Sequence, residues 1–203
     1  MTEPLRVSVL ASHRGSSLQA VLDATSAGEL NAIVVAVISN NSRAQALQRA
    51  RDAGVPACHI SSQTHEDEDA AIRAMLNAAS TELVLTLGYM KKLGPLSLAA
   101  YRGRILNTHP SLLPKHGGQG MFGEHVHAAV LAAGETETGA SIHLVEPEYD
   151  TGSVIAQRRV PVEGGDKPGT LADRVLAEEH LMLVETLRRI EAGETLLPGL
   201  QRP

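Results

Sequence analysis

The sequence predicts an α/β fold with a Rossmann-like, doubly wound, mostly parallel sheet and helices on both faces. Two observations support this prediction. Segments rich in β-branched residues alternate with segments of helical periodicity through the first half of the chain. The strand-like segments are apolar almost without interruption, which is typical of parallel strands buried on both faces. A β-α-β order of this kind also implies right-handed crossovers.

Four strands are expected in the first half, with three helices between them. The strands are expected at 6–12, 32–40, 82–89 and 103–109, and the helices at 16–30, 43–54 and 65–80. In the first helix Leu18, Val21 and Leu22 fall on one face, and Gly28 suits its end. The third helix has an acidic first turn, which the helix dipole favours.

The second half is organised differently. A helix is expected at 124–134, two strands at 139–147 and 153–162 around a turn, a long amphipathic helix at 167–193, and a short surface tail after it. There is no internal repeat, low-complexity block or linker. We therefore expect a single domain over residues 1–203.

Composition excludes several classes of function. The chain has 203 residues, a net charge of −5 and 2% aromatic residues. The negative charge argues against nucleic-acid or membrane-surface binding, and no apolar run approaches the ~18 residues of a membrane span. The N-terminus is not a signal peptide, and Cys58 is the single cysteine, so we expect a cytoplasmic protein without disulfides.

Two strand ends carry the first candidate site residues, because ligands of open parallel sheets bind beyond the carboxyl ends of strands. After the first strand, Gly15, Ser16 and Ser17 lead into a helix whose free N–H groups suit a monophosphate; an ordinary serine-capped helix is the alternative. After the fourth, Asn107 and His109 should share one side and could donate hydrogen bonds to an oxyanion. A buried histidine beside a turn asparagine is the alternative there.

A third candidate lies in the second half. Ser141 and His143 alternate on an expected strand, and Asp150 follows in the turn, where it could orient an imidazole and move protons. Asp150 could equally be a plain turn residue. Residues 118–123 fit G-x-G-x-x-G, but they do not follow a strand directly, so a nicotinamide cofactor is not expected. Metal is not expected either, because His125 and His127 cannot share a helix face.

Together these motifs resemble one family. The segments NTHPSLLPK and GASIHLVEPEYDTGSVIAQRRVPV resemble the folate-dependent formyltransferases, from about Arg6 to Ile190, and RGSSLQ resembles the branch that acts on glycinamide ribonucleotide. The resemblance implies formyl transfer from 10-formyltetrahydrofolate to the amine of glycinamide ribonucleotide in de novo purine biosynthesis, without metal. It implies phosphate binding in the N-terminal half, folate binding and catalysis in the C-terminal half, and a possible homodimer.

The resemblance also implies roles for individual residues. Asn107 and protonated His109 would donate to the oxyanion of the tetrahedral intermediate, while Asp150 holds His109 and assists proton movement. The ribonucleotide would contact Gly15, Ser16, Ser17, Pro110 and Glu179. The folate would contact Tyr89, Met90, Lys91, Lys92, Leu93, Asn107, Ser141, His143, Val145, Glu146, Glu148 and Asp150. The sequence departs from the family pattern at three of these motifs, with His13 in place of a small residue, Ser17 in place of asparagine and Lys91 in place of arginine; lysine lacks the planar fork of arginine.

Three other functions are compatible with the same motifs. A formyltetrahydrofolate deformylase uses the same three catalytic residues with water as acceptor, but usually has an extra N-terminal domain, whereas this chain begins at its first expected strand. A methionyl-tRNA formyltransferase usually has a C-terminal RNA-binding domain, whereas a short tail is expected here. A non-catalytic nucleotide- or folate-binding module would not need Asn107, His109 and Asp150 together.

Overall fold

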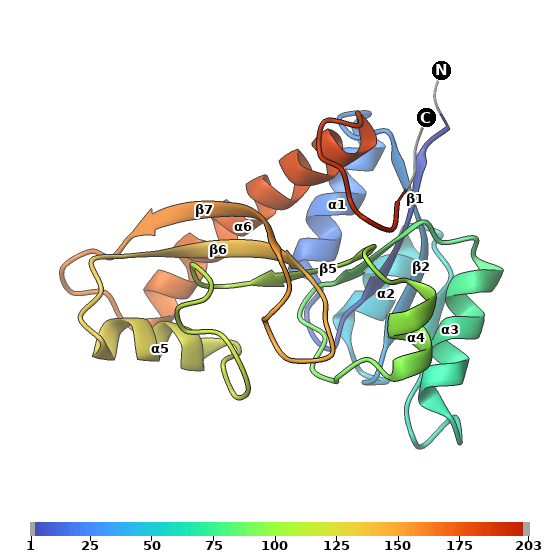
Figure 1. Cartoon of the computed structure of the whole chain (residues 1–203), viewed down its shortest axis with the longest axis horizontal. Helices are drawn as coiled ribbons and strands as arrows, with labels where there is room; N and C mark the ends of the chain where they lie inside the picture. The colour runs from blue at the N-terminus through green and yellow to red at the C-terminus, as the bar shows by residue number, and fades with distance from the viewer. Residues whose placement is uncertain (1–2, 201–203) are drawn as a thin grey trace. The chain divides into compact units, whose positions relative to one another are not determined.

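The computed structural model describes residues 3–200 (Figure 1), which form a seven-stranded sheet of order β3-β2-β1-β4-β5-β6-β7. The strands are β1 (Leu5–Leu10), β2 (Ala32–Ser39), β3 (Ala57–His59), β4 (Leu83–Thr86), β5 (Ile105–His109), β6 (Glu137–Leu144) and β7 (Val154–Pro161). The helices are α1 (Ser16–Ser26), α2 (Gln45–Asp52), α3 (Glu68–Ala78), α4 (Pro95–Ala100), α5 (Glu124–Ala132) and α6 (Pro168–Glu191). Neighbours from β3 to β4 are parallel and β6–β7 is antiparallel. The predicted mostly parallel α/β fold is confirmed.

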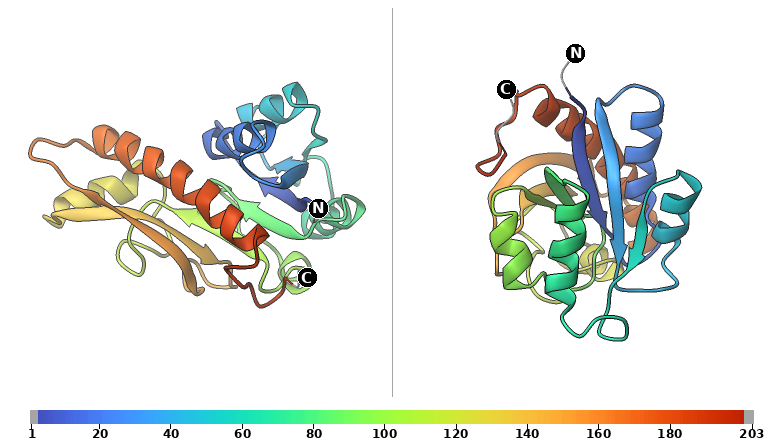
Figure 2. Two further views of the ribbon diagram at one scale, coloured as in Figure 1. Left: turned by 90° about the horizontal axis from the view of Figure 1, so that it is seen from above. Right: turned by 90° about the vertical axis from the view of Figure 1, so that its right-hand side faces the viewer.

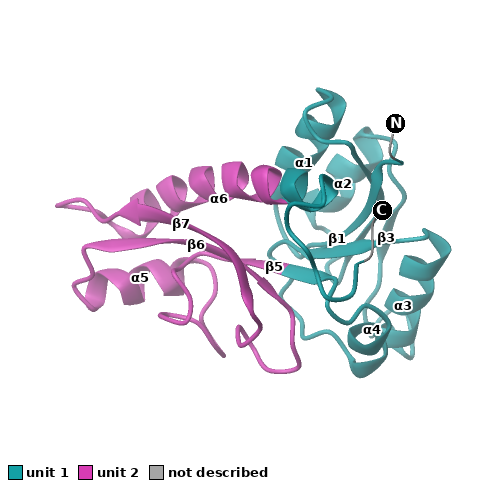
Figure 3. Ribbon diagram, turned by 45° about the horizontal axis from the view of Figure 1, so that its top comes forward, with its two compact units in different colours: residues 1–106, 187–203 teal, residues 107–186 magenta. Residues whose placement is uncertain are grey.

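The chain divides into two compact units, coloured separately in Figure 3. Unit 1 comprises residues 1–106 and 187–203, and unit 2 comprises residues 107–186. The boundary therefore runs through β5 and through α6. The single domain expected over 1–203 stays a prediction.

Unit 1 has the predicted doubly wound arrangement. Helices α1 and α2 lie on one face of the parallel strands and α3 and α4 on the other (Figure 2). Because helices cover both faces, strand side chains that point to either face of the sheet are buried: Val7, Val9, Val37 and Ile38 are all 0% exposed.

Two short elements of unit 1 were not expected from the sequence. Strand β3 has three residues and α4 has six, which is too short for either to show a periodic pattern. Some strands are also shorter at their carboxyl ends than the sequence predicted. The strand expected at 82–89 ends at Thr86 as β4, and Gly88, with a φ of 67°, then turns the chain.

The prediction of a surface tail after the last helix is partly wrong. Leu197 is only 4% exposed, and the N–H of Gly199 donates to the carbonyl of Gly103 at 3.3 Å, so this segment packs against the rest of unit 1. Residues 201–203 of that tail lie outside the described residues. Within residues 3–200, none of the helices combines the length and apolarity that crossing a membrane would require.

Unit 2 is built on the β6–β7 hairpin. The register of this antiparallel pair shifts between Ile142 and His143, and such bulges re-aim side chains. Helix α6 is tied to β7 by charge, because Arg158 reaches Glu178 at 3.2 Å and Glu185 at 2.6 Å. The loop from Pro110 to Gly123 joins β5 to α5 and supplies backbone groups to the site described next.

Candidate active site

The end of β5 presents its side chains on alternate faces, as the sequence predicts. Asn107 and His109 share one face, and Thr108 between them points to the other. His109 is 4% exposed. On the first face the Nδ2 atom of Asn107 lies 3.0 Å from Nε2 of His143 on β6. A strand end and a neighbouring strand therefore bring one amide and two imidazoles together.

Asp150 joins this cluster from the turn between β6 and β7. Its Oδ2 atom lies 3.5 Å from Nδ1 of His109, and its Oδ1 atom lies 3.4 Å from Nε2 of His143. The backbone N–H of Gly118 donates to Oδ2 at 2.8 Å. Asp150 itself has a φ of 56°, in the left-handed region that non-glycine residues seldom occupy. Backbone strain of this kind gathers at functional sites.

The hydrogen bonds of His143 define its neutral form. Its Nδ1 atom lies 2.8 Å from the carbonyl oxygen of Leu144, which can only accept, so Nδ1 carries the proton. In the neutral ring Nε2 then accepts from the amide of Asn107. Asn107 is thereby oriented with its NH₂ group toward the cluster.

The protonation states follow from burial and partners. Burial lowers the pKa of His109, and this outweighs the opposing effects of the Asp150 charge and of the hydrogen bond to His116. Burial by itself would raise the pKa of Asp150, but its contact with His143 and the hydrogen bond from the N–H of Gly118 hold it below its ordinary value. In the free protein His109 is therefore neutral and Asp150 ionised. The protonated His109 expected from the sequence must acquire its proton during a reaction.

The glycine-rich loop after β5 contacts both residues with backbone atoms. The Nε2 atom of His109 donates to the carbonyl of His116 at 2.9 Å, as Gly118 donates to Asp150. A Cβ on Gly117 would lie 2.5 Å from Leu113 and 3.3 Å from Cβ of Asp150. The loop needs glycine to approach this closely. Sequence reasoning missed these contacts because backbone groups leave no residue-type signal.

Ser141 was expected to contact folate, and its surroundings argue against that role. It is 0% exposed, and its hydroxyl donates to the carbonyl of Ser111 at 2.6 Å. The same oxygen accepts from the N–H of Leu113 at 3.0 Å and from the amide of Gln157 at 2.9 Å. With its hydrogen-bonding capacity filled, Ser141 fixes the start of the loop instead. Gln157 is a supporting residue that the sequence did not reveal.

Glu179 lies on the opposite face of β5 from the cluster. It is 6% exposed, and its Oε1 atom accepts from the hydroxyl of Thr108 at 3.1 Å. Because Thr108 points away from Asn107 and His109, a ligand could touch Glu179 and His109 together only around the strand end. Pro110, which forms that end, is half-buried.

The expected phosphate loop of unit 1 precedes α1. Gly15 has a φ of 68°, and a Cβ there would lie 2.7 Å from Cβ of Ala46 and 2.8 Å from its Cα. Glycine is thus required by the packing of the loop on α2, whatever binds there. No side chain caps α1, so the serine-cap alternative is wrong. Ser16 is half-buried at the first helical position and Ser17 is 8% exposed.

The expected folate segment of unit 1 follows β4. Burial, helped by the Glu68 charge, raises the pKa of Tyr89 to about 12, which keeps its phenol protonated. Met90 and Lys92 are exposed, and the Nζ atom of Lys91 lies 2.7 Å from Oε2 of Glu68. Leu93 is different, because its side chain is buried in the core at 7% exposure; a ligand would meet its backbone only.

The acidic turn in unit 2 is the other expected folate segment. Val145 is half-buried, and Glu146 and Glu148 are exposed. Asp150 ends this turn and is the member that joins the cluster. Among residues 3–200, no group of three or more His, Cys, Asp or Glu side chains is placed to hold a metal ion.

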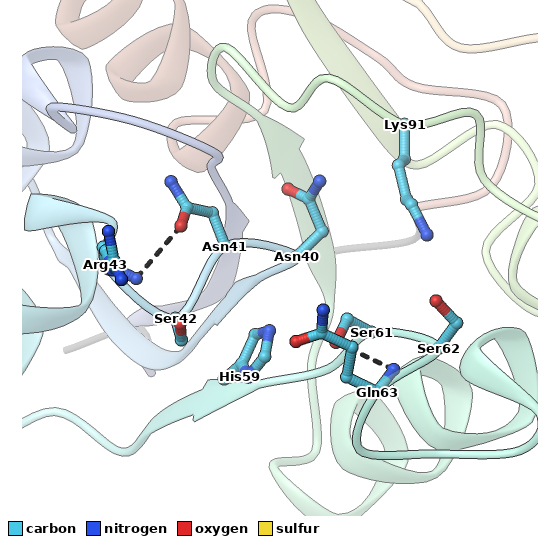
Figure 4. A pocket seen from close by; sticks show the side chains of 9 residues that line it. All are labelled: Asn40, Asn41, Ser42, Arg43, His59, Ser61, Ser62, Gln63 and Lys91. Carbon is cyan, nitrogen blue, oxygen red and sulfur yellow. Dashed lines mark hydrogen bonds between the residues drawn. The ribbon is translucent and has the colours of Figure 1, made fainter.

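A separate polar pocket of about 470 Å³ lies in unit 1, beyond the carboxyl ends of β2 and β3 (Figure 4). Its lining residues carry amide, hydroxyl, imidazole or cationic groups, and they are Asn40, Asn41, Ser42, Arg43, His59, Ser61, Ser62, Gln63 and Lys91. Of the residues expected to bind a substrate, only Lys91 lines it. No motif in the sequence pointed to this pocket.

Comparison with known proteins gives the same assignment as these motifs. Residues 5–187 match the family model described as formyl transferase. The phosphoribosylglycinamide formyltransferase of Escherichia coli is 37% identical over 179 residues, which cover 87% of this chain and 82% of that protein. The trifunctional purine biosynthetic protein adenosine-3 of Drosophila melanogaster is 40% identical over 197 residues. That match covers 95% of this chain, but the chain spans only 14% of the longer protein.

Solved structures agree. The crystal structure of glycinamide ribonucleotide transformylase 1 from Symbiobacterium toebii superposes with a TM-score of 0.90 at 37% sequence identity, covering 98% of this chain and 93% of that one. The family model, the relatives and the solved structures therefore agree: this chain belongs to the formyl transferase family, and several of its relatives are named phosphoribosylglycinamide formyltransferases.

Proposed function

We propose that this chain transfers the formyl group of 10-formyltetrahydrofolate to the primary amine of glycinamide ribonucleotide. The observation that carries the proposal is the cluster in unit 2 of two buried imidazoles, His109 and His143, with the half-buried side chains of Asn107 and Asp150. It offers N–H donors beside an ionised carboxylate, which suits attack on a carbonyl without a nucleophilic side chain.

In the proposed reaction the amine nitrogen attacks the formyl carbon, and the carbonyl electrons move to oxygen. Asn107 supplies one N–H donor to that oxygen, because its NH₂ group is already turned toward the cluster. His109 supplies another from Nε2, which carries a proton in the free protein. In the free protein this N–H donates to the carbonyl of His116. The formyl oxygen therefore replaces that carbonyl as the acceptor when substrate binds.

Proton movement completes the reaction. The attacking nitrogen loses a proton, the folate N10 gains one, and the bond between N10 and the formyl carbon breaks. The Asp150 carboxylate faces both imidazoles, so it can receive the proton and pass it on or stabilise it on His109. A neutral His109 is ready to accept this proton at Nδ1, where it gains a charge-assisted bond to Asp150.

The remaining expected contacts belong to the same proposal. Gly15, Ser16 and the N-terminus of α1 would bind the ribonucleotide phosphate. Tyr89, Met90 and Lys91, together with the turn ending at Asp150, would contact the folate, which serves as co-substrate. We also place the chain in the cytoplasm and expect a homodimer.

The decisive experiment separates acceptors. The purified protein is incubated with 10-formyltetrahydrofolate, with and without glycinamide ribonucleotide, while tetrahydrofolate and formate are followed. The proposal requires folate turnover that depends on the ribonucleotide, a mass gain of one formyl group on it, and little formate. A transferase must exclude water from the formyl carbon, because hydrolysis consumes the donor.

The alternatives give different results in the same assay. Rapid formate release without acceptor would identify a formyltetrahydrofolate deformylase. Binding of both ligands without turnover would identify a non-catalytic module. Formylation of methionyl-tRNA, offered as a third acceptor, would identify the tRNA enzyme.

A further inference from the structure

The imidazole of His109 is held at both ring nitrogens. Nε2 lies 2.9 Å from the carbonyl oxygen of His116. Because a carbonyl only accepts, Nε2 carries the proton in the neutral ring, and Nδ1 presents its lone pair to Asp150 at 3.5 Å. The position of one backbone carbonyl therefore selects the tautomer of His109.

That carbonyl belongs to a strained residue. His116 has a φ of 54°, and a non-glycine residue keeps such a backbone only where its surroundings hold it. Two groups hold this segment. The Ser111 hydroxyl donates to the carbonyl of Lys115 at 2.6 Å, and the second group is the carboxylate of Glu135.

Glu135 follows α5 and reaches back to two successive loop residues. Its Oε1 and Oε2 atoms each lie 3.0 Å from Nζ of Lys115, and Oε1 lies 3.4 Å from Nε2 of His116. The carboxylate is 24% exposed and the His116 side chain 17%. The His116 side chain and Glu135 take no part in the proposed mechanism, yet His116 contacts His109 through its carbonyl and Glu135 contacts His116.

We propose that Glu135 is a positioning residue for His109, acting through His116: it fixes the segment whose carbonyl selects the Nε2-protonated tautomer. This inference rests on the proposed function for its effect on rate. The selected tautomer is the one that presents an N–H donor at Nε2 and an acceptor at Nδ1 beside Asp150. Glu135 thereby prepares the ring before substrate arrives.

The main variant is Glu135→Gln, which keeps the size of the side chain and removes its charge. Glu137→Gln is the matched control, because Glu137 lies two residues away and pairs with the exposed Arg159 at 2.7 Å instead of the loop. We expect kcat to fall about three- to tenfold in Glu135→Gln with little change in either KM, and Glu137→Gln to match the wild type.

A second variant tests the route through His116. His116→Asn tolerates the left-handed backbone and removes the imidazole that Glu135 contacts. If Glu135 acts through His116, the double variant Glu135→Gln/His116→Asn loses no more kcat than the more impaired single variant. Fully additive losses would overturn the route, because additivity is the behaviour of independent sites.

The direct readout is the tautomer itself. Imidazole ¹⁵N shifts distinguish protonated from unprotonated ring nitrogens, and His109→Gln identifies the signals of His109 by their loss. We expect a single Nε2-protonated form in the wild type and in Glu137→Gln, and a mixture of tautomers in Glu135→Gln. A merely structural role of Glu135 would lower stability without changing this signature.

An unchanged tautomer in Glu135→Gln would overturn the proposal whatever the activity, and so would a changed tautomer with wild-type or higher kcat. Should the wild-type chain have no transferase activity, the proposed function fails, while the ¹⁵N measurement still decides whether Glu135 positions His109. The two failures are therefore distinguishable.

Discussion

The Nδ1 atom of His109 lies 3.5 Å from Oδ2 of Asp150, with side-chain exposures of 4% and 11% respectively. A neutral imidazole that faces an ionised carboxylate with its lone pair gains nothing from the contact. Once a proton reaches Nδ1, the same contact becomes a charge-assisted hydrogen bond. In the proposed reaction the pair would thus stabilise a state that exists only during proton transfer, which is what catalysis requires.

Asp150→Asn tests this arrangement. The amide keeps the shape of the side chain and can still accept from Gly118, so the fold and both KM values should be retained. It cannot take up the proton, and we expect kcat to fall roughly a hundredfold or more. Asp173→Asn, an exposed position on α6, is the control. Near-normal turnover in purified Asp150→Asn would remove Asp150 from the mechanism.

Gly152→Ala tests how the turn positions the cluster. A Cβ on Gly152 would collide with the carbonyl group of Leu144, the group that accepts from Nδ1 of His143. The methyl group must therefore displace the turn that carries Asp150 or the end of β6. We expect a loss of kcat of at least tenfold, on the scale of a small misplacement of catalytic groups.

The control for that variant is Gly164→Ala in the loop after β7, where an added Cβ meets nothing within 4 Å. Steady-state kinetics on both variants provide the measurement. Equal kcat values in the two would mean that the position of the Leu144 carbonyl does not matter.

The sequence predicted where Asn107, His109 and Asp150 lie in their strand and turn, because local sequence patterns determine those positions. The alternation of Asn107 and His109 on one strand face follows from strand geometry alone. The turn that carries Asp150 follows a strand and stands out by composition. These features depend on neighbours in the chain.

The rest depends on contacts between distant segments. Ser141 has the same position in the strand pattern as a ligand-facing residue, and only the partners Ser111, Leu113 and Gln157 reveal its supporting role. The His116 carbonyl carries no residue-type signal at all. Gly15 suggested a phosphate loop, but its contact with Ala46 is a packing requirement that no local motif encodes.

His127 on α5 should make stability depend on pH. It is 4% exposed, and its Nδ1 atom has no hydrogen-bond partner within residues 3–200. Burial lowers its pKa from 6.5, with a smaller contribution from His109 and opposition from Glu124. As pH falls below about 6.5 the unfolded chain binds the proton first, so the free energy of unfolding decreases until the lowered folded pKa is reached.

The measurement is urea unfolding of the wild type and of His127→Gln between about pH 7.5 and 5.5. One proton accounts for at most about 1.4 kcal/mol per pH unit, and His127→Gln should lose its share of that slope. His125→Gln, at an exposed position on the same helix, is the control and should keep the slope of the wild type. Parallel curves for all three proteins would mean that His127 does not contribute.

Ser16→Ala tests the phosphate loop without disturbing its packing. Gly15→Val would be ambiguous, because any side chain at Gly15 also meets Ala46. Ser16 stands at the first position of α1, where its hydroxyl can donate to an anion beside the free N–H groups of the helix. A hydrogen bond to a charged group contributes about 1.5 kcal/mol or more, so KM for glycinamide ribonucleotide should rise about tenfold. KM for the folate and kcat should stay unchanged, as should all three constants in Ser26→Ala at the other end of the same helix. Equal KM values for the ribonucleotide in Ser16→Ala and wild type would mean that the phosphate is bound elsewhere.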